Sequence, residues 1–486
     1  MSIARQAAHG VAWNMAWGIS TRVLTLVGQV VLAHYLLPAE AGETSNAAIA
    51  VLTANAFTAF SFGQYLITKR ASPEVAFQAW VVHVALGVFA LAVVYLLRGP
   101  ICSVFDTPGA ARYVLGYALS YLIIDRVRYV PERLLMRELR FRALATINGL
   151  GEIAYIAVSL ATVRAWHGYA LVFGAIVKSL VTSVLFLGAA PRSEWLVRAR
   201  LRLADIRDLV TYGVPIMIAI VTDNATKRWD NVVVSRLFGA GVVGAYNYAY
   251  NLAETPISYV AEHIGEVLMP SFSRMPAEQR DRAAISSASL MSLVVSPLGV
   301  GLGAVAPTVV GAFFNAQWQE RMTPMLAILS VMFVFRPMTW SVTAYVQAVQ
   351  RTRVLVLSSV LRAVLVLAGV GVCGYLGGPN WACVGAGVGF FVTTVATIAA
   401  AAGATSLPVG AYLRAVARPL LPCVPMYLAV VAIERGLAAA GAPLVVSLIA
   451  QILAGAIVYV AAAFVLVRPT VDELLRVART TIRRPR

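Results

Sequence analysis

Long apolar runs separated by short polar stretches repeat along the whole chain. A helix needs about 20 consecutive apolar residues to cross a bilayer, and about fourteen stretches come close to that length. The pattern therefore predicts an all-α, polytopic membrane protein. The expected spans are 11–36, 44–68, 74–97, 110–130, 142–163, 168–190, 207–235, 242–268, 284–313, 322–348, 354–376, 381–402, 412–433 and 443–467.

A polar stretch at 191–206 divides the chain after six predicted spans. We expect an N-terminal lobe at 1–190, this cytoplasmic linker, a C-terminal lobe at 207–402, and two more spans with a tail at 403–486. The lobes share a weak repeat, because Gly42-x-x-Ser45-x-Ala47 is matched by Gly244-x-x-Asn247-x-Ala249. Repeats of this kind are common in transporters and make the two lobes pseudo-symmetric.

The tail after Thr470 alternates apolar residues with arginines and predicts an amphipathic helix lying on the inner leaflet. Thr470 and Glu473 have the spacing of a capping box, in which a side chain at the helix start bonds the backbone three residues on. Anchoring to the membrane is the expected role of this tail.

Composition supports the membrane interpretation. The chain is 60% hydrophobic and 13% charged, whereas soluble proteins are about 25% charged. A net charge of +17 is also found in proteins that bind nucleic acid, but the distribution of the basic residues along the chain argues against that partner. Of the 39 lysines and arginines, 27 lie in alternate loops and the tail, including the stretch 126–142, six lie on the opposite side, and six lie within spans. This positive-inside bias predicts two cytoplasmic termini and contact with anionic membrane lipids.

Charged residues inside spans are costly and usually face a bundle interior or a water-filled cavity. The six cations could also be snorkelling or structurally paired side chains. They are Arg22, Lys178, Lys227, Arg228, Arg336 and Arg362.

Carboxylates inside spans are candidates for coupling transport to H⁺ or Na⁺. Asp223, Asp230 and Glu254 are the three that we single out. Asp223 and Lys227 have i,i+4 spacing, so the alternative for Asp223 is an intrahelical salt bridge.

Catalytic and metal-binding signals are absent from the sequence. The four cysteines have no metal-ligand spacing, and no motif combines a nucleophile with its base or cradles a phosphate. We therefore expect a protein that is not an enzyme and has neither a metal nor a cofactor.

Several segments resemble Wzx-type polysaccharide flippases of the multidrug/oligosaccharidyl-lipid/polysaccharide (MOP) flippase superfamily. They are Tyr212–Pro215, Arg236–Gly239, Val243–Ala249, Pro131–Arg137 and Leu268–Ser273. The resemblance implies two six-helix lobes around a central cavity, two extra C-terminal helices and a place in the bacterial inner membrane. It also implies export of undecaprenyl-pyrophosphate-linked oligosaccharide units for surface polysaccharide and lipopolysaccharide.

With such a substrate, the six cations would bind the pyrophosphate, because guanidinium groups form bidentate hydrogen bonds with phosphate. Polymerase and glycosyltransferases of the same pathway would be partners. The alternatives are a drug or lipid exporter of the same superfamily and a membrane glycosyltransferase, polymerase or ligase. Short loops argue against the enzymes, which generally need a sizeable outward loop.

Overall fold

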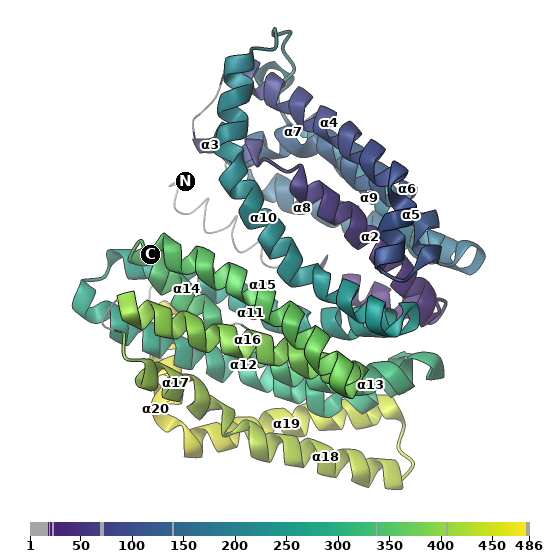
Figure 1. Cartoon of the computed structure of the whole chain (residues 1–486). Helices are drawn as coiled ribbons and strands as arrows, with labels where there is room; N and C mark the ends of the chain where they lie inside the picture. Colours follow the sequence, from purple (N-terminus) through teal and green to yellow (C-terminus); the bar gives the residue numbers. More distant parts are fainter. Residues whose placement is uncertain are drawn as a thin grey trace. The chain divides into compact units, whose positions relative to one another are not determined.

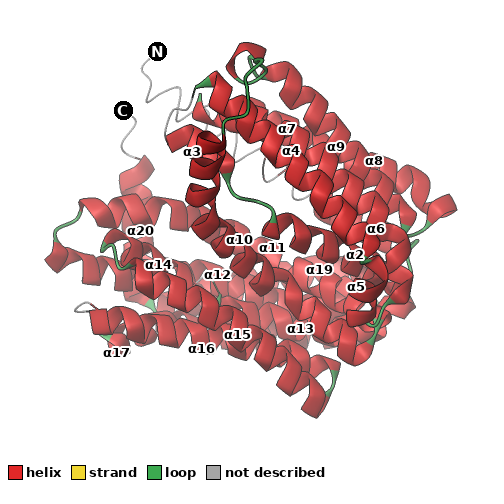
Figure 2. Ribbon diagram, turned by 45° about the horizontal axis from the view of Figure 1, so that its top comes forward, coloured by secondary structure: helices red, strands yellow, loops and turns green. Residues whose placement is uncertain are grey.

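The computed structural model of the chain describes residues 18, 20–21, 24–68, 72–138, 140–336, 338–404 and 407–482. Every regular element in these ranges is helical (Figure 2), which confirms the predicted all-α fold. Nine helical stretches among them are long and apolar enough to cross a membrane. α2, α10 and α11 are not among these nine, and the first part of the predicted span 11–36 lies largely outside the described residues.

The chain forms two compact units, residues 1–244 and 245–486, shown in Figure 1 from purple to teal and from teal to yellow. The helices of the first unit are α2 (Pro38–Phe57), α3 (Phe62–Thr68), α4 (Pro73–Leu96), α5 (Arg98–Val104), α6 (Ala111–Ala118), α7 (Asp125–Arg137), α8 (Phe141–Trp166), α9 (Tyr169–Ala189) and α10 (Leu203–Phe238). α6 continues into α7 through a π-helical segment, Leu119–Ile124.

The second unit contains most of α11 (Ala240–Arg274) and the remaining helices. These are α12 (Ala277–Phe313), α13 (Ala316–Met332), α14 (Met338–Ala348), α15 (Thr352–Gly377), α16 (Pro379–Ala404), α17 (Val409–Ala417), α18 (Cys423–Ala439), α19 (Leu444–Leu466) and α20 (Arg468–Ile482). Short 3₁₀ turns lie at Pro108–Ala110, Arg192–Glu194, Phe333–Phe335 and Arg418–Leu420.

The units do not divide at the polar stretch 191–206, because this stretch is docked on the first unit. The Trp195 ring is buried and packs 5.5 Å from the Trp80 ring. The Gln78 side chain accepts from the Arg202 backbone N–H at 2.8 Å and donates to Asp205 at 2.8 Å. α10 then packs along α2, α3 and α4. That 191–206 separates the two transport lobes stays a prediction.

The repeat-related glycines Gly42 and Gly244 lie against each other's helices inside the first unit, which includes the first turn of α11. A Cβ on Gly42 would overlap the carbonyl oxygen of Ala240, and one on Gly244 would overlap that of Pro38. Each glycine therefore meets the residue four positions before the other. Small residues of this kind let helix backbones approach closely in membranes, where packing replaces the hydrophobic effect.

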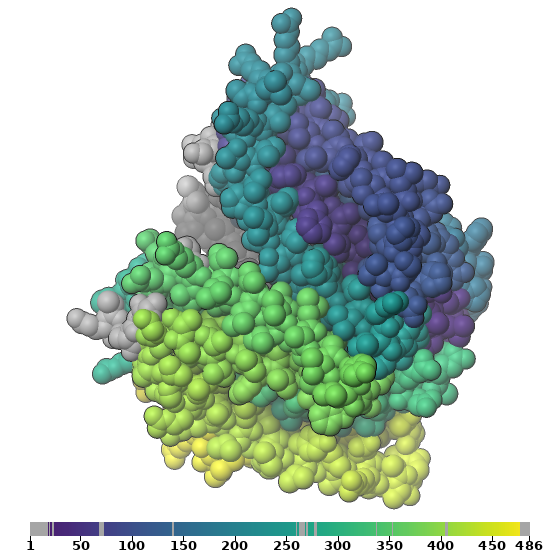
Figure 3. Space-filling model, in the orientation of Figure 1, coloured from purple at the N-terminus to yellow at the C-terminus, as the bar shows by residue number. Residues whose placement is uncertain are grey.

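In the second unit α12 is central, contacting α13, α14, α17, α18, α19 and α20. Gln451 on α19 is fully buried and bonds Thr308 on α12, with its Nε2 2.9 Å from the Thr308 hydroxyl. α18 and α19 expose large apolar side chains such as Leu428, Ile457 and Val465. These helices belong to the C-terminal part, whose residues form the yellow edge of that unit in Figure 3, as expected for a lipid-facing surface.

The tail forms the predicted helix, α20, but the predicted capping box is wrong. α20 begins at Arg468, so Thr470 lies inside it. The two side chains bond α12 instead: the Thr470 and Ser289 hydroxyls are 3.2 Å apart, and Ser286 donates to Glu473 at 2.5 Å. The polar face of α20 is thus partly used to dock the tail on its own unit.

The Gly42 contact can be tested by Gly42→Ala. The added methyl should lower the thermal unfolding midpoint of the detergent-solubilised protein, because overpacking costs about 1–3 kcal/mol. Gly188→Ala in α9 is the matched control, since a Cβ there meets nothing within 4 Å. An unchanged midpoint for Gly42→Ala would show that the helices separate there without cost.

Candidate functional site

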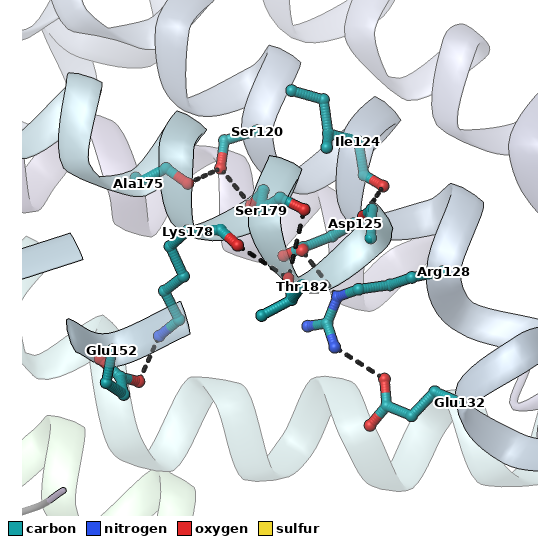
Figure 4. Close-up of polar contacts among 11 residues, drawn as sticks. Ser120, Ile124, Asp125, Arg128, Glu132, Glu152, Ala175, Lys178, Ser179 and Thr182 are labelled. Carbon is teal, nitrogen blue, oxygen red and sulfur yellow. Dashed lines mark hydrogen bonds and ion pairs between the residues drawn. The ribbon is translucent and has the colours of Figure 1, made fainter. Parts of the chain in front are cut away.

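The first unit brings several ionic side chains together beside the π-helical segment. Arg128 on α7 donates to Asp125 at 2.9 Å and to Glu132 at 2.8 Å. Lys178 on α9 forms an ion pair with Glu152 on α8. Figure 4 shows the Lys178–Glu152 pair on one side of Thr182 and Arg128 with Glu132 on the other.

Tyr121 lies in the π-helical segment. Its hydroxyl interacts electrostatically with charges from α7, α8 and α10, namely Asp125, Glu152 and Arg228. We call Tyr121, Asp125, Arg128, Glu132, Glu152, Lys178 and Arg228 the Tyr121 cluster. Two of the predicted substrate-binding cations are members of this cluster, Lys178 through its ion pair with Glu152 and Arg228 through its electrostatic interaction with Tyr121.

Hydroxyl groups fix α9 against the π-helical segment. The Ser120 and Ser179 hydroxyls lie 2.7 Å apart, and Ser120 also donates to the Ala175 carbonyl oxygen at 3.0 Å. Ser183 donates to the Ile124 carbonyl oxygen at 2.8 Å (Figure 4). Backbone groups inside a membrane need partners within the protein, so these serines both satisfy the irregular backbone and hold Lys178 in place.

Arg228 differs from the other two cations of the Tyr121 cluster. It is half-buried, and within the described ranges it forms no ion pair. Its neighbour Trp229 donates its indole N–H to Thr53 on α2 at 3.2 Å, which fixes this turn of α10. A half-buried guanidinium without a carboxylate keeps its donors available for an anionic ligand.

The remaining predicted cations are distributed over both units. Lys227 pairs with Asp223 at 3.0 Å, which is the intrahelical alternative. Arg336 is buried and pairs with Glu254 of α11, while Arg362 lies 3.4 Å from the Ser359 hydroxyl. Arg22 lies outside the described residues.

The three candidate coupling carboxylates have different surroundings. Asp223 is about 60% exposed at its side chain. Asp230 is completely buried and accepts from the Asn231 backbone N–H at 2.9 Å and side-chain amide at 3.1 Å. Glu254 is held by Arg336 and lies 3.5 Å from the Ser258 hydroxyl. The described residues contain no group of three or more His, Cys, Asp or Glu side chains placed to hold a metal.

Sequence reasoning missed Arg126. It was counted with the basic cytoplasmic stretch 126–142, but the structure buries it to 1% exposure inside the first unit. The available signal was its position four residues inside the predicted span 110–130.

Known proteins resemble this chain in sequence and in fold. A model of the family described as polysaccharide biosynthesis protein matches residues 31–323. The chain belongs to this family. The lipopolysaccharide biosynthesis protein WzxC of Escherichia coli (strain K12) is 23% identical and aligns over 81% of this chain and 80% of its own length. The succinoglycan biosynthesis transport protein ExoT of Rhizobium meliloti (strain 1021) is 24% identical, over 68% of this chain and 66% of its own.

Solved structures share the fold at low identity. The lipid II flippase MurJ in an inward closed conformation has a TM-score of 0.78 at 14% identity, covering 94% of this chain and 99% of MurJ. An inward-facing multidrug resistance transporter of the MOP superfamily has a TM-score of 0.62 at 14% identity, covering 80% of this chain and 95% of its own. The predicted polysaccharide flippase is confirmed at the level of family and fold.

The Lys178–Glu152 pair can be tested by comparing single and double variants. We expect Lys178→Met and Glu152→Met each to lower the unfolding midpoint, because each leaves one charge without its partner. The double variant should lose less than the sum, with an interaction energy of about 0.5–3 kcal/mol. Additive losses would mean that the two side chains contribute independently.

Proposed function

We propose that this protein flips polyprenyl-pyrophosphate-linked oligosaccharides from the cytoplasmic to the outer leaflet of a bacterial inner membrane. The membership in the polysaccharide biosynthesis family supports the pathway, and the flippase-like fold supports the activity. Undecaprenyl pyrophosphate is the proposed carrier, and both chain termini lie in the cytoplasm. Glycosyltransferases would supply the substrate and a polymerase would consume it.

The observation that supports an anionic headgroup most directly is that Arg228 is half-buried and forms no ion pair within the described ranges. Lys178 and Arg128 share the Tyr121 cluster with it, but carboxylates neutralise them. A pyrophosphate that enters the cluster can therefore bind Arg228 without first breaking an ion pair. Bidentate bonding to phosphate favours arginine over lysine at this position.

Arg228→Ala should abolish polysaccharide export in a strain that lacks its own flippase, while the amount of protein in the membrane stays unchanged. Arg228→Lys should restore part of the export, since lysine keeps the charge without the planar fork. Arg236→Ala is the matched control on the same helix, because Arg236 forms only an exposed pair with Asp106 at 3.8 Å. Normal export by Arg228→Ala would refute the headgroup role. If the wild-type protein gave the strain resistance to toxic cations and no polysaccharide export, the drug exporter would be favoured.

We further propose that an H⁺ or Na⁺ gradient drives lobe movement through an intramembrane carboxylate. Glu254 is the leading candidate, with Asp223 and Asp230 as the others. Its pairing with the buried Arg336 supports this role: neutralising Glu254 with H⁺ or Na⁺ would remove the counter-charge of Arg336, which lies between α13 and α14 in the chain.

In proteoliposomes, a gradient of the coupling ion should accelerate flipping by the wild-type protein. Glu254→Gln should flip at a rate that no longer depends on the gradient, because glutamine cannot exchange a proton or balance a cation. Imposing H⁺ and Na⁺ gradients separately identifies the ion. Retention of the full gradient dependence by Glu254→Gln would exclude this carboxylate.

A further inference from the structure

Two interrupted spans of the first unit meet at Arg126. α2 ends at Phe57 and α3 begins at Phe62, with Ser61 between them at a φ of 46°. The other interruption is the π-helical segment, and Arg126 is the second residue of α7 directly after it. The end of a helix leaves its last carbonyl groups without intrahelical partners.

Arg126 supplies the missing donors. Its Nη2 lies 2.8 Å from Asn55 Oδ1 and 2.5 Å from the Thr58 hydroxyl, both at the end of α2. Its Nη1 lies 3.0 Å from the His83 carbonyl oxygen on α4 and 3.4 Å from the Thr58 carbonyl oxygen. One guanidinium thus connects α7 with two other helices.

No carboxylate among the described residues pairs with Arg126. Its charge lies at the C-terminal end of α2, where the helix dipole is negative. Gly87 on α4 makes room for the side chain, since a Cβ there would come within 2.6 Å of Arg126 Cδ. A buried cation without a counter-charge is costly, so we look for a role of Arg126 beyond packing.

The end of α2 is in turn connected to α10. Thr53, two residues before Asn55, accepts the Trp229 indole N–H at 3.2 Å and lies 3.5 Å from Asn224 Oδ1. Trp229 directly follows Arg228 in the chain. Arg126 is therefore linked to the backbone of Arg228 in three steps. It bonds Asn55, the α2 backbone connects Asn55 to Thr53, and Thr53 bonds Trp229, the next residue after Arg228.

The second unit contains a similar arrangement. Arg336 follows a 3₁₀ interruption, Phe333–Phe335, and is 6% exposed. It bonds Glu254 and lies 3.5 Å from the Tyr250 hydroxyl, both on α11. Arg336 lies 16 residues before Thr352, where α15 begins, and Arg126 lies 15 residues before Phe141, where α8 begins. A buried arginine after a helix interruption thus holds α2, the helix that contains Gly42, and another holds α11, the helix that contains Gly244.

We propose that Arg126 is a positioning residue for Arg228: it fixes the broken end of α2, and Thr53 transmits this order to the α10 turn that presents Arg228 to the pyrophosphate. This inference rests on the proposed function. Arg126 does not itself contact the substrate, because its two terminal nitrogens already bond Asn55, Thr58 and His83, and its Nε is buried inside the first unit.

The test measures binding of undecaprenyl pyrophosphate to the purified full-length protein in nanodiscs. Arg126→Lys keeps the charge but has a single donor nitrogen, which cannot span all the acceptors. Thr53→Val removes the hydrogen bond to Trp229 and leaves the contacts of Arg126 in place. It therefore tests the positioning role even if Arg126→Lys does not fold. Thr162→Val is the matched control, since the Thr162 hydroxyl bonds only Val158 O of its own helix.

Arg228→Ala, Arg126→Lys and Thr53→Val should each weaken binding about tenfold or more, the loss of roughly one charge-assisted hydrogen bond. In an Arg228→Ala background, Arg126→Lys and Thr53→Val should have no further effect, because they act only through Arg228. Two results would overturn the positioning role alone. One is weak binding by Arg228→Ala together with wild-type binding by Thr53→Val. The other is a further loss of binding when Arg126→Lys or Thr53→Val is added to Arg228→Ala. Wild-type binding by Arg228→Ala would overturn the headgroup role in the proposed function.

Discussion

Hydrocarbon offers no counter-charge, so a cation inside a span needs its partner within the protein. This constraint accounts for most of the polar interior. Lys178 is paired across two helices, Arg336 is paired with Glu254, and Lys227 is paired along its own helix. Arg126 uses carbonyl, amide and hydroxyl oxygens instead. Against this background the half-buried Arg228 differs, because no ion pair within the described residues balances its charge.

The sequence predicts the fold class well because the bilayer imposes a simple pattern on it. Apolar runs of sufficient length, alternating basic loops and the internal match of Gly42 with Gly244 are all visible without coordinates. The Asp223–Lys227 pair is also predictable, because i,i+4 residues adjoin on any helix. Local spacing is enough for features of this kind.

Pairing between helices is not predictable in the same way. Glu152 and Lys178 are 26 residues apart, and their contact depends on how α8 and α9 cross. Arg126 was misplaced because the residue pattern reveals neither the gap between α2 and α3 nor the π-helical segment that orients α7. The boundary of the first unit also lies later than the polar stretch 191–206, since the docking of Trp195 depends on tertiary packing.

The order of these partners along the chain bears on how the protein is made. The acceptors of Arg126 lie at residues 55, 58 and 83, Glu152 precedes Lys178, and Glu254 precedes Arg336. Chains emerge from the ribosome N-terminus first, so each of these cations enters the membrane after its acceptor has been synthesised. The helices that carry these cations can therefore pack directly against helices that are already in the membrane. No unpaired charge then has to enter the lipid.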